Sequence, residues 1–412
     1  MSAPAVAPRA RQARPPVAAW QDRERRIRRR VGIAWGLLLL NVLTFYPGLS
    51  FIPFPSIVGK GIQQGSLIAA FLVALSVNRR LLIRPNLYLC LVSLLAIETF
   101  VSALFPQHFG YEVRTFRLAA YVVTLWLLTP WWGRRDLLLV RAHLTALLVV
   151  LGSVILGLLI SPGRAMTYGN TGRLFGVVWP IQPTDVAQFA AVAIGLVAIL
   201  WSCGHLRGRA ALIVVVAVVP VLLLTHTRTA LAAMVAGLLV AGLSLIVVRA
   251  RVRKLFAAAA VVIAIAVITA SSVISTFLER GQGTKQLTEL TGRTVVWSAL
   301  LAAPRDRFQE LFGQGLSNDS FNGLNIDSTW LAAYNDQGLI GVALCVAILI
   351  FLLLLACFRP RDVRRALALF LIVYVLVASI TEVGFASASS YLLELTLAAT
   401  LLLPSAAVRE PP

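Results

Sequence analysis

A series of long apolar runs, separated by short polar segments, limits what this chain can fold into. Of its 412 residues, 59% are hydrophobic and only 13% are charged. A soluble domain of this size could not cover so much apolar surface with polar side chains. A helix that crosses a membrane needs about 20 mostly apolar residues. Runs of roughly that length lie at 31–49, 62–78, 86–105, 115–132, 137–160, 182–203, 210–225, 229–248, 255–277, 337–357, 366–384 and 386–404. The sequence therefore predicts an all-α, polytopic membrane protein with about twelve transmembrane helices.

The basic residues follow a regular pattern along the chain. Lys and Arg total 37 against 17 Asp and Glu, which gives a formal net charge of +20. A basic soluble domain would point to nucleic acid as a partner, but these arginines stand in short clusters between apolar runs. The clusters fall on alternate connections, at 23–30, 79–84, 134–135, 207–209, 249–254 and 359–365. Cytoplasmic connections carry such clusters, so we expect both termini in the cytoplasm, a location in the bacterial inner membrane, and no binding of nucleic acid.

This topology divides the chain into five parts. We expect a cytoplasmic basic tail at 1–30, helices one to nine at 31–277, an extracytoplasmic loop at 278–336, helices ten to twelve at 337–404, and a cytoplasmic tail at 405–412. Only the loop is long enough to fold by itself. Within it, Thr291 is a candidate cap of a helix that runs to about Ala303, and Arg305–Phe312 reads as a second, amphipathic helix before Gly313. No strong strand signal is present.

The sequence contains no pattern that indicates a bound metal or other cofactor. Its four cysteines lie within or beside apolar runs, without a CxxC pair and without His at the spacing of metal ligands. No glycine-rich motif that cradles phosphate is present. We therefore expect a protein that works without a cofactor.

Three charged residues stand out on the predicted extracytoplasmic side: Arg228, Arg293 and Asp327. Each also has a simpler interpretation. Arg228 could anchor the end of a helix at the membrane surface, and Arg293 could belong to a solvated face of the loop. Asp327 could cap a helix that begins at Ser328. The residue types alone do not choose between these roles.

The sequence context of these residues resembles a known family. The stretches are His-Thr-Arg-Thr-Ala-Leu-Ala-Ala from His226, Thr-Gly-Arg-Thr-Val-Val-Trp from Thr291, Leu-Phe-Gly-Gln-Gly-Leu-Ser from Leu311 and Asp-Ser-Thr-Trp-Leu-Ala-Ala-Tyr-Asn-Asp-Gln-Gly from Asp327. Together they resemble the O-antigen ligase and polymerase superfamily (WaaL-like and Wzy-like membrane glycosyltransferases). The resemblance is specific over about 225–345 and looser around Gly172–Gly176, and the first five helices match in topology only.

The resemblance implies a function. Family members transfer sugar from an undecaprenyl-diphosphate donor to the hydroxyl of a glycan or lipid-glycan acceptor, without a metal. By position, Arg228 and Arg293 match the family's two arginines, and Asp327 stands where many members have His. That exchange favours a polymerase-like or divergent member over a ligase proper. The resemblance therefore makes Asp327, Arg293 and Arg228 the candidate catalytic residues.

The expected chemistry suits these side chains. Two guanidinium groups can hold a diphosphate through charge-assisted hydrogen bonds. A carboxylate in reach of the acceptor hydroxyl can act as general base, and a single displacement inverts the anomeric configuration. Nearby charged residues are candidates for binding substrate: Arg173, Arg117, Glu98, His226 and Arg164. Glu98 has a structural alternative, in which it pairs with Arg117 inside the membrane.

Two other functions share the same topology. A transporter or flippase for lipid-linked glycan would also have many spans and buried carboxylates, but it should show an internal repeat, and none is evident. A peptidoglycan glycosyltransferase of the shape-determining family would also fit an extracytoplasmic Asp, and the identity of its donor would distinguish it.

Overall fold

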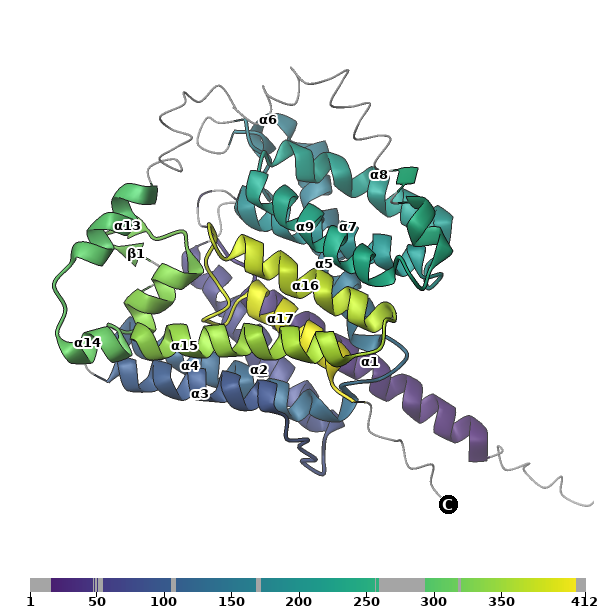
Figure 1. The fold of residues 1–412 in the computed structure, drawn as a ribbon, viewed down its shortest axis with the longest axis horizontal. Coiled ribbons are helices and arrows are strands. Elements are labelled where there is room, and N and C mark those ends of the chain that lie inside the picture. Colours follow the sequence, from purple (N-terminus) through teal and green to yellow (C-terminus); the bar gives the residue numbers. More distant parts are fainter. Residues whose placement is uncertain are drawn as a thin grey trace, which may run out of the picture.

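The protein is a bundle of helices that mostly run side by side along its longest axis (Figure 1). The computed structural model describes residues 16–46, 48, 50, 55–104, 109–167, 172–255, 257–258, 293–317 and 320–404. The first ten helices are α1 (Pro16–Val42), α2 (Ser56–Val77), α3 (Leu87–Ala103), α4 (Phe109–Leu128), the 3-10 helix η1 (Thr129–Trp131), α5 (Leu138–Ile160), α6 (Pro162–Ala165), α7 (Pro183–Ser202), α8 (Gly208–Leu224) and α9 (Arg228–Leu245). The later elements are α13 (Arg293–Ala302), α14 (Arg307–Phe312), β1 (Ser320–Phe321), β2 (Leu324–Asn325), α15 (Thr329–Phe358), α16 (Val363–Ala378) and α17 (Ser390–Leu402).

The described helices confirm an all-α fold and are those of a membrane-embedded protein. Five of them, α2, α5, α7, α9 and α15, are long and apolar enough to cross a membrane within the described part of the chain. Other apolar helices, such as α3, α8 and α17, are shorter. The predicted span at 255–277 lies outside the described residues from 259 onward, as does the loop up to 292. The count of twelve spans stays a prediction.

Several predicted boundaries differ from the structure, for example where α2 and α4 begin six residues ahead of the predicted runs, at Ser56 and Phe109. Helix α1 begins at Pro16, so much of the predicted basic tail is helical, because its Arg, Glu and Ala residues are good helix formers. Helix α15 begins at Thr329, ahead of the predicted 337. Helix α16 ends at Ala378, ahead of the predicted 384, so Glu382 lies in the connection 379–389 and not in a helix.

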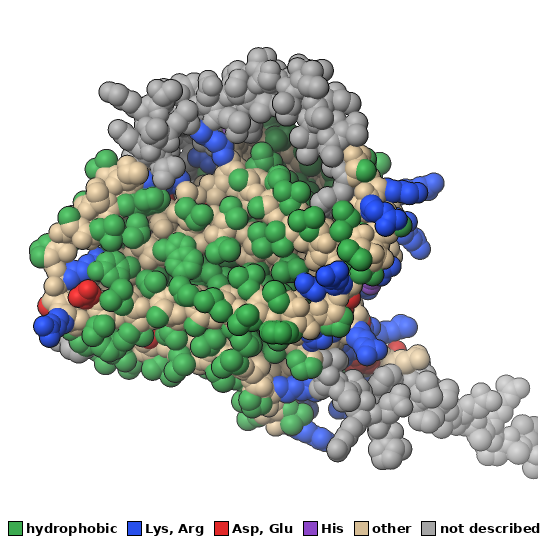
Figure 2. Space-filling model, in the orientation of Figure 1, with side chains coloured by type: hydrophobic (Ala, Val, Ile, Leu, Met, Phe, Trp, Pro, Cys, Tyr) green, Lys and Arg blue, Asp and Glu red, His purple; other side chains and the backbone are tan. Residues whose placement is uncertain are grey.

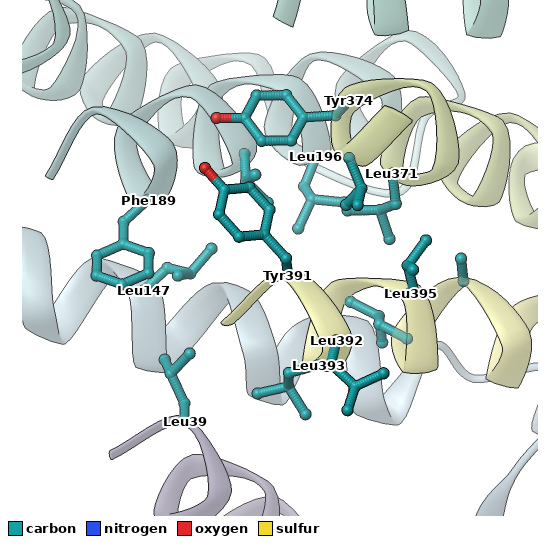
Figure 3. Close-up of a cluster of buried hydrophobic side chains, with 14 of the residues drawn as sticks. Leu39, Leu147, Phe189, Leu196, Leu371, Tyr374, Tyr391, Leu392, Leu393 and Leu395 are labelled. Carbon is teal, nitrogen blue, oxygen red and sulfur yellow. The ribbon is translucent and has the colours of Figure 1, made fainter. Parts of the chain in front are cut away.

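The core lies where α17 meets the helices around it. All thirteen residues of α17 are buried, and Figure 3 shows its Leu392, Leu393 and Leu395 among side chains from α1, α5, α7 and α16. Helix packing inside a membrane depends on close contact more than on the exclusion of water. Phe370 of α16 illustrates this, because a Cβ atom added at Gly195 of α7 would lie only 1.9 Å from its ring. The small residue lets the two helices approach.

The surface of the bundle separates apolar and charged regions along its length. Helix α3 buries Leu95, Thr99 and Ser102 but exposes Leu94, Ile97 and Phe100. Figure 2 shows a broad hydrophobic middle, with Lys and Arg gathered toward the two ends and most of them at the right. We call the right-hand end the arginine-rich end. It brings together the arginine clusters at 23–30, 79–80, 134–135, 249–251 and 359–365.

The arginine-rich end contains a network of ion pairs. Arg134 Nη2 lies 2.7 Å from Glu24 Oε1, and its Nε lies 3.1 Å from Asp136 Oδ2. Arg28 also donates to Asp136. Partial burial opposes ionisation of Asp136, but the hydrogen bond from Arg28 and the charge of Arg134 outweigh it and lower its pKa. This network joins α1 to the connection between α4 and α5.

The opposite end, which we call the loop end, carries α13, α14 and a small β-hairpin (Figure 1). The two helices agree closely with the predicted ones, and Asp306 caps α14 through a hydrogen bond from Gln309 N. The pairing of β1 with β2 was not predicted from the strand pattern. Its turn is Asn322-Gly323, both with positive φ, which is the strongest short signal for a hairpin.

Helix α15 has a kink at Gly338, where φ is 63° and ψ is −162°. The end of α14 fits into this kink. Gln314 N donates to Asn335 O, and Gly315 N donates to Asp336 O, at 2.9 and 3.0 Å. These bonds satisfy carbonyl groups that the broken helix leaves without helical partners.

Candidate functional site

Arg293 and Asp327, two of the three predicted catalytic residues, form an ion pair. Arg293 Nε donates to Asp327 Oδ2 at 3.1 Å, although 34 residues separate them in the chain. The two side chains keep 24% and 38% of their surface exposed, so they are accessible to a ligand. The pair joins the first residue of α13 to the segment that precedes α15.

Local structure holds Asp327 in this place. Its φ is 47°, a left-handed conformation that Asp tolerates better than most residues. On one side, Trp297 Nε1 donates to Ile326 O at 2.6 Å. On the other, the backbone N–H and the hydroxyl of Thr329 both donate to Glu382 O. Asp327 does not cap α15: Ser328 occupies the N-cap position, and the carboxylate of Asp327 bonds to Arg293.

A cavity of about 290 Å³ lies beside this ion pair. Its charged lining residues come from five segments of the chain, and they are Arg114, Arg117, Asp185, Asp327, Asp336 and Glu382. The rest of the wall includes Thr44, Gln63, Asn325 and the hydroxyl-bearing residues Ser387, Ser389, Ser390 and Tyr391. The cavity therefore offers both positive and negative groups, together with many hydrogen-bonding partners.

Glu382 lies at the centre of the charges around the cavity. Burial is the largest influence on its carboxyl group and raises its pKa to about 8. The charge of Arg293 opposes this shift, whereas the charges of Asp327 and Asp185 add to it, and Arg173 opposes it more weakly. The charges of Arg293, Asp327, Asp185 and Arg173 therefore all influence the pKa of Glu382. With a pKa of about 8, its carboxyl group is largely protonated at neutral pH.

The other cavity residues are fixed by hydrogen bonds. Arg117 Nη2 donates to Asn41 O at 2.8 Å, and Arg114 Nη1 donates to Leu316 O at 2.6 Å. The hydroxyl of Thr44 donates to Asp185. These bonds join α1, α4, α7 and the loop, so the cavity wall depends on four parts of the chain being packed together.

Arg117 lies in the cavity wall, but Glu98 does not. The expected alternative pairing of Glu98 with Arg117 is not formed, since Arg117 bonds to Asn41. Glu98 is buried in α3, and neither of its carboxylate oxygens has a hydrogen-bond partner within the described part of the chain.

The structure brings Arg228 and Arg173 to the same end of the bundle as the ion pair. Arg228 begins α9, and the hydroxyl of Thr229 lies 2.8 Å from that of Thr381, the residue before Glu382. Arg173 donates to Thr225 O at 2.9 Å and to Thr227 Oγ1 at 3.0 Å. Arg228 thus begins the helix that contacts the connection carrying Glu382, and Arg173 bonds to the turn that precedes this helix. Neither arginine is among the described residues that line the cavity.

His226 and Arg164 are also absent from the described cavity lining. His226 adopts a φ of 50° in the turn between α8 and α9, and its N–H donates to Leu223 O. Arg164 lies in the short helix α6, and its carbonyl accepts hydrogen bonds from Thr167. The cavity therefore contains two of the eight predicted site residues, Asp327 and Arg117, and a third, Arg293, contacts it through Asp327.

The sequence-based site lacked three carboxyl groups that line the cavity: Asp185, Asp336 and Glu382. The sequence does contain a feature that singles them out, because each of the three stands at or near the terminus of a predicted apolar run, on the side of the bundle that carries the loop. Ionisable residues in such places are often functional. Which of them share a cavity depends on how the helix ends converge.

Comparison with known proteins yields no match to any protein-family model or to any curated protein.

The raised pKa of Glu382 predicts a pH-dependent stability. The folded protein keeps this proton up to about pH 8, whereas an exposed Glu releases it near pH 4.5. The stabilising contribution of the protonated group is therefore complete below about pH 4.5 and lost as the pH rises through 8. We expect the Tm of the purified protein to fall between pH 6 and pH 9, and to fall less in Glu382→Gln. Glu310→Gln, at an exposed position of α14, is the control, and an equal slope in all three proteins would contradict the prediction.

Proposed function

We propose that the protein is a membrane glycosyltransferase that moves or polymerises glycan from an undecaprenyl-diphosphate donor to an acceptor hydroxyl on the extracytoplasmic side. The observation that carries this proposal is the contact between Arg293 and Asp327 at a cavity of mixed charge. It joins the side chain that would remove a proton to one that would hold a phosphate. The resemblance to O-antigen ligases and polymerases points to the same residues.

The proposed reaction is one displacement. The acceptor hydroxyl oxygen attacks the anomeric carbon of the donor sugar, and its proton passes to the carboxylate of Asp327. The bond between the anomeric carbon and the phosphate oxygen breaks, and its electron pair stays on the undecaprenyl diphosphate that leaves. The new glycosidic bond has the inverted configuration. General-base catalysis of this kind typically contributes about 10²–10⁴-fold.

Arginine would stabilise the leaving diphosphate. Arg293 bonds to Asp327 through Nε, and no bond from its Nη groups to another described residue is formed. In our proposal these Nη groups donate to phosphate oxygens. In our proposal Arg228, at the start of α9, supplies the second guanidinium, and Arg173 and Arg117 add positive potential. Contacts of this kind at a partly shielded site stabilise a transition state in which negative charge develops.

The size of the cavity limits what it would hold. At about 290 Å³, it is near the lower end of the range for small-molecule sites. This volume suits a sugar ring and the adjoining phosphates, not a whole glycan. The remaining repeat units would extend into solvent, and the polyprenyl tail would lie along the apolar surface of the bundle.

A transfer assay without an ion gradient tests the proposal. The protein would be reconstituted into vesicles with an undecaprenyl-diphosphate-linked oligosaccharide, and the lipid-linked products would be measured by mass spectrometry. We expect longer or transferred glycan and free undecaprenyl diphosphate, with the inverted linkage by NMR. Movement of the intact donor between leaflets without a product would indicate a flippase instead. Turnover restricted to a lipid-linked disaccharide-peptide would indicate a peptidoglycan glycosyltransferase.

A further inference from the structure

A second and larger cavity, of about 750 Å³, lies at the arginine-rich end. Its wall is built from α1, the end of α2 with the turn that follows, and η1. Five arginines line it together with an aromatic side chain, and these are Arg23, Arg26, Arg30, Arg79, Arg80 and Trp131. No carboxylate is among its described lining residues.

The positive charge of this cavity is not neutralised by the nearby carboxylates. Glu24 and Asp136, which lie close by, form ion pairs with Arg28 and Arg134. In contrast, none of the five cavity arginines forms an ion pair with any residue that the structure describes. A topology signal requires arginines on one side of the membrane, but it does not require five of them to surround one cavity.

The wall of this cavity is held in place before any ligand binds. Asn78, which lines it, donates from Nδ2 to Leu127 O at 2.9 Å and to Leu82 O at 2.8 Å. Its Oδ1 accepts from Leu82 N at 2.9 Å. Thr129 is the first residue of η1, and its hydroxyl accepts a hydrogen bond from Arg84 N at 3.0 Å. These bonds fix the turn that carries Arg79 and Arg80 against η1, so binding would require little ordering of the chain.

Apolar side chains beside the arginines indicate a lipid as the ligand. Leu81, Leu82 and Ile83 follow Arg80 directly, and 57%, 58% and 51% of their surfaces are exposed. Three adjacent aliphatic side chains are unfavourable when exposed to water. They are favourable in a lipid bilayer, at the boundary between the headgroups and the acyl chains. Trp131 belongs to the residue type that is enriched at this boundary. A soluble anion would use the guanidinium groups and leave the aliphatic side chains without a role.

We propose that this cavity binds the phosphate groups of an anionic phospholipid, with the lipid's acyl chains against Leu81, Leu82 and Ile83. The site is independent of the proposed glycosyl transfer, since it lies at the other end of the bundle. Basic residues near a membrane surface each contribute to the binding of anionic lipid, and guanidinium groups form two hydrogen bonds to one phosphate. The lipid would connect the N-terminal half of α1 to the turn after α2.

Lipid binding by matched variants tests this site. One variant carries Arg26→Gln, Arg30→Gln and Arg79→Gln. The control carries Arg207→Gln, Arg209→Gln and Arg253→Gln, three exposed arginines outside the cavity. Delipidated protein in detergent would be titrated with cardiolipin, phosphatidylglycerol, phosphatidylcholine or inorganic phosphate, and bound lipid would be counted by native mass spectrometry. We expect wild type and control to bind anionic lipid within twofold of each other, and the cavity variant to bind it at least tenfold more weakly.

Three results would overturn the proposal: equal losses in both variants, equal binding of phosphatidylcholine, or binding of inorganic phosphate that prevents lipid binding at equal concentration. A second measurement applies if the cavity variant fails to fold. Anionic lipid with brominated acyl chains should quench the fluorescence of wild-type protein, and Trp131→Phe should remove part of that quenching. Unchanged quenching in Trp131→Phe would contradict a lipid in this cavity.

Discussion

Asp327→Asn should lower the rate of glycan transfer by about 10²–10⁴-fold, the usual contribution of a general base. The amide has nearly the shape of the carboxylate but cannot accept the proton of the acceptor hydroxyl. The expected loss is in kcat, with a small change in KM, because the substituted amide can still occupy the cavity wall. Rates of product formation in reconstituted vesicles would measure this, and Glu310→Gln on the exposed face of α14 is the matched control.

Substitutions of Arg293, the ion-pair partner of Asp327, test the same proposal. Arg293→Ala should also lower transfer strongly, because it removes both a phosphate donor and the side chain that orients Asp327. Arg293→Lys keeps the charge but not the paired N–H groups, so it should fall between wild type and Arg293→Ala. The double variant with Asp327→Asn should lose less than the product of the two single losses, because the residues act together. Normal turnover in both single variants would remove the basis of the proposed function.

Gly338→Ala and Gly313→Ala should produce the largest losses of stability. Both glycines have positive φ, 63° and 78°, and an added Cβ would lie 2.3 Å from Leu311 O or 2.4 Å from the Asp336 carbonyl carbon. Unfavourable backbone conformations cost about 1–3 kcal/mol each, and the steric overlap with fixed backbone adds to this. We expect a lower Tm in detergent and weaker glycan transfer, since Asp336 in the cavity wall depends on this kink.

The control for these substitutions is Gly152→Ala in α5. Gly152 is helical, and an added Cβ there would meet no atom within 4 Å. Ala is the better helix former, so this variant should be as stable as wild type or slightly more stable. A similar Tm for all three variants would show that the α14–α15 junction is not held by its glycines.

The sequence by itself determined the helices. A backbone in lipid must satisfy its own hydrogen bonds, so a long apolar run has few alternatives to a helix, and most predicted runs coincide with described helices. The helices α13 and α14 were predictable for a similarly local reason, because Pro304 and Gly313 mark their ends. The hairpin was missed because its strands have only two residues each, too few for an alternating pattern, although Asn322-Gly323 marks its turn.

Only the tertiary structure decided which charged groups share a cavity. Asn41 bonds to Arg117, and Thr44 bonds to Asp185, across 76 and 141 residues of chain. Glu382 lies near Arg293 because α16 ends early and its connection folds against the start of α15. Hydrophobic periodicity contains no information about such contacts, since it depends on neighbours along the chain, whereas a site depends on where the ends of packed helices converge.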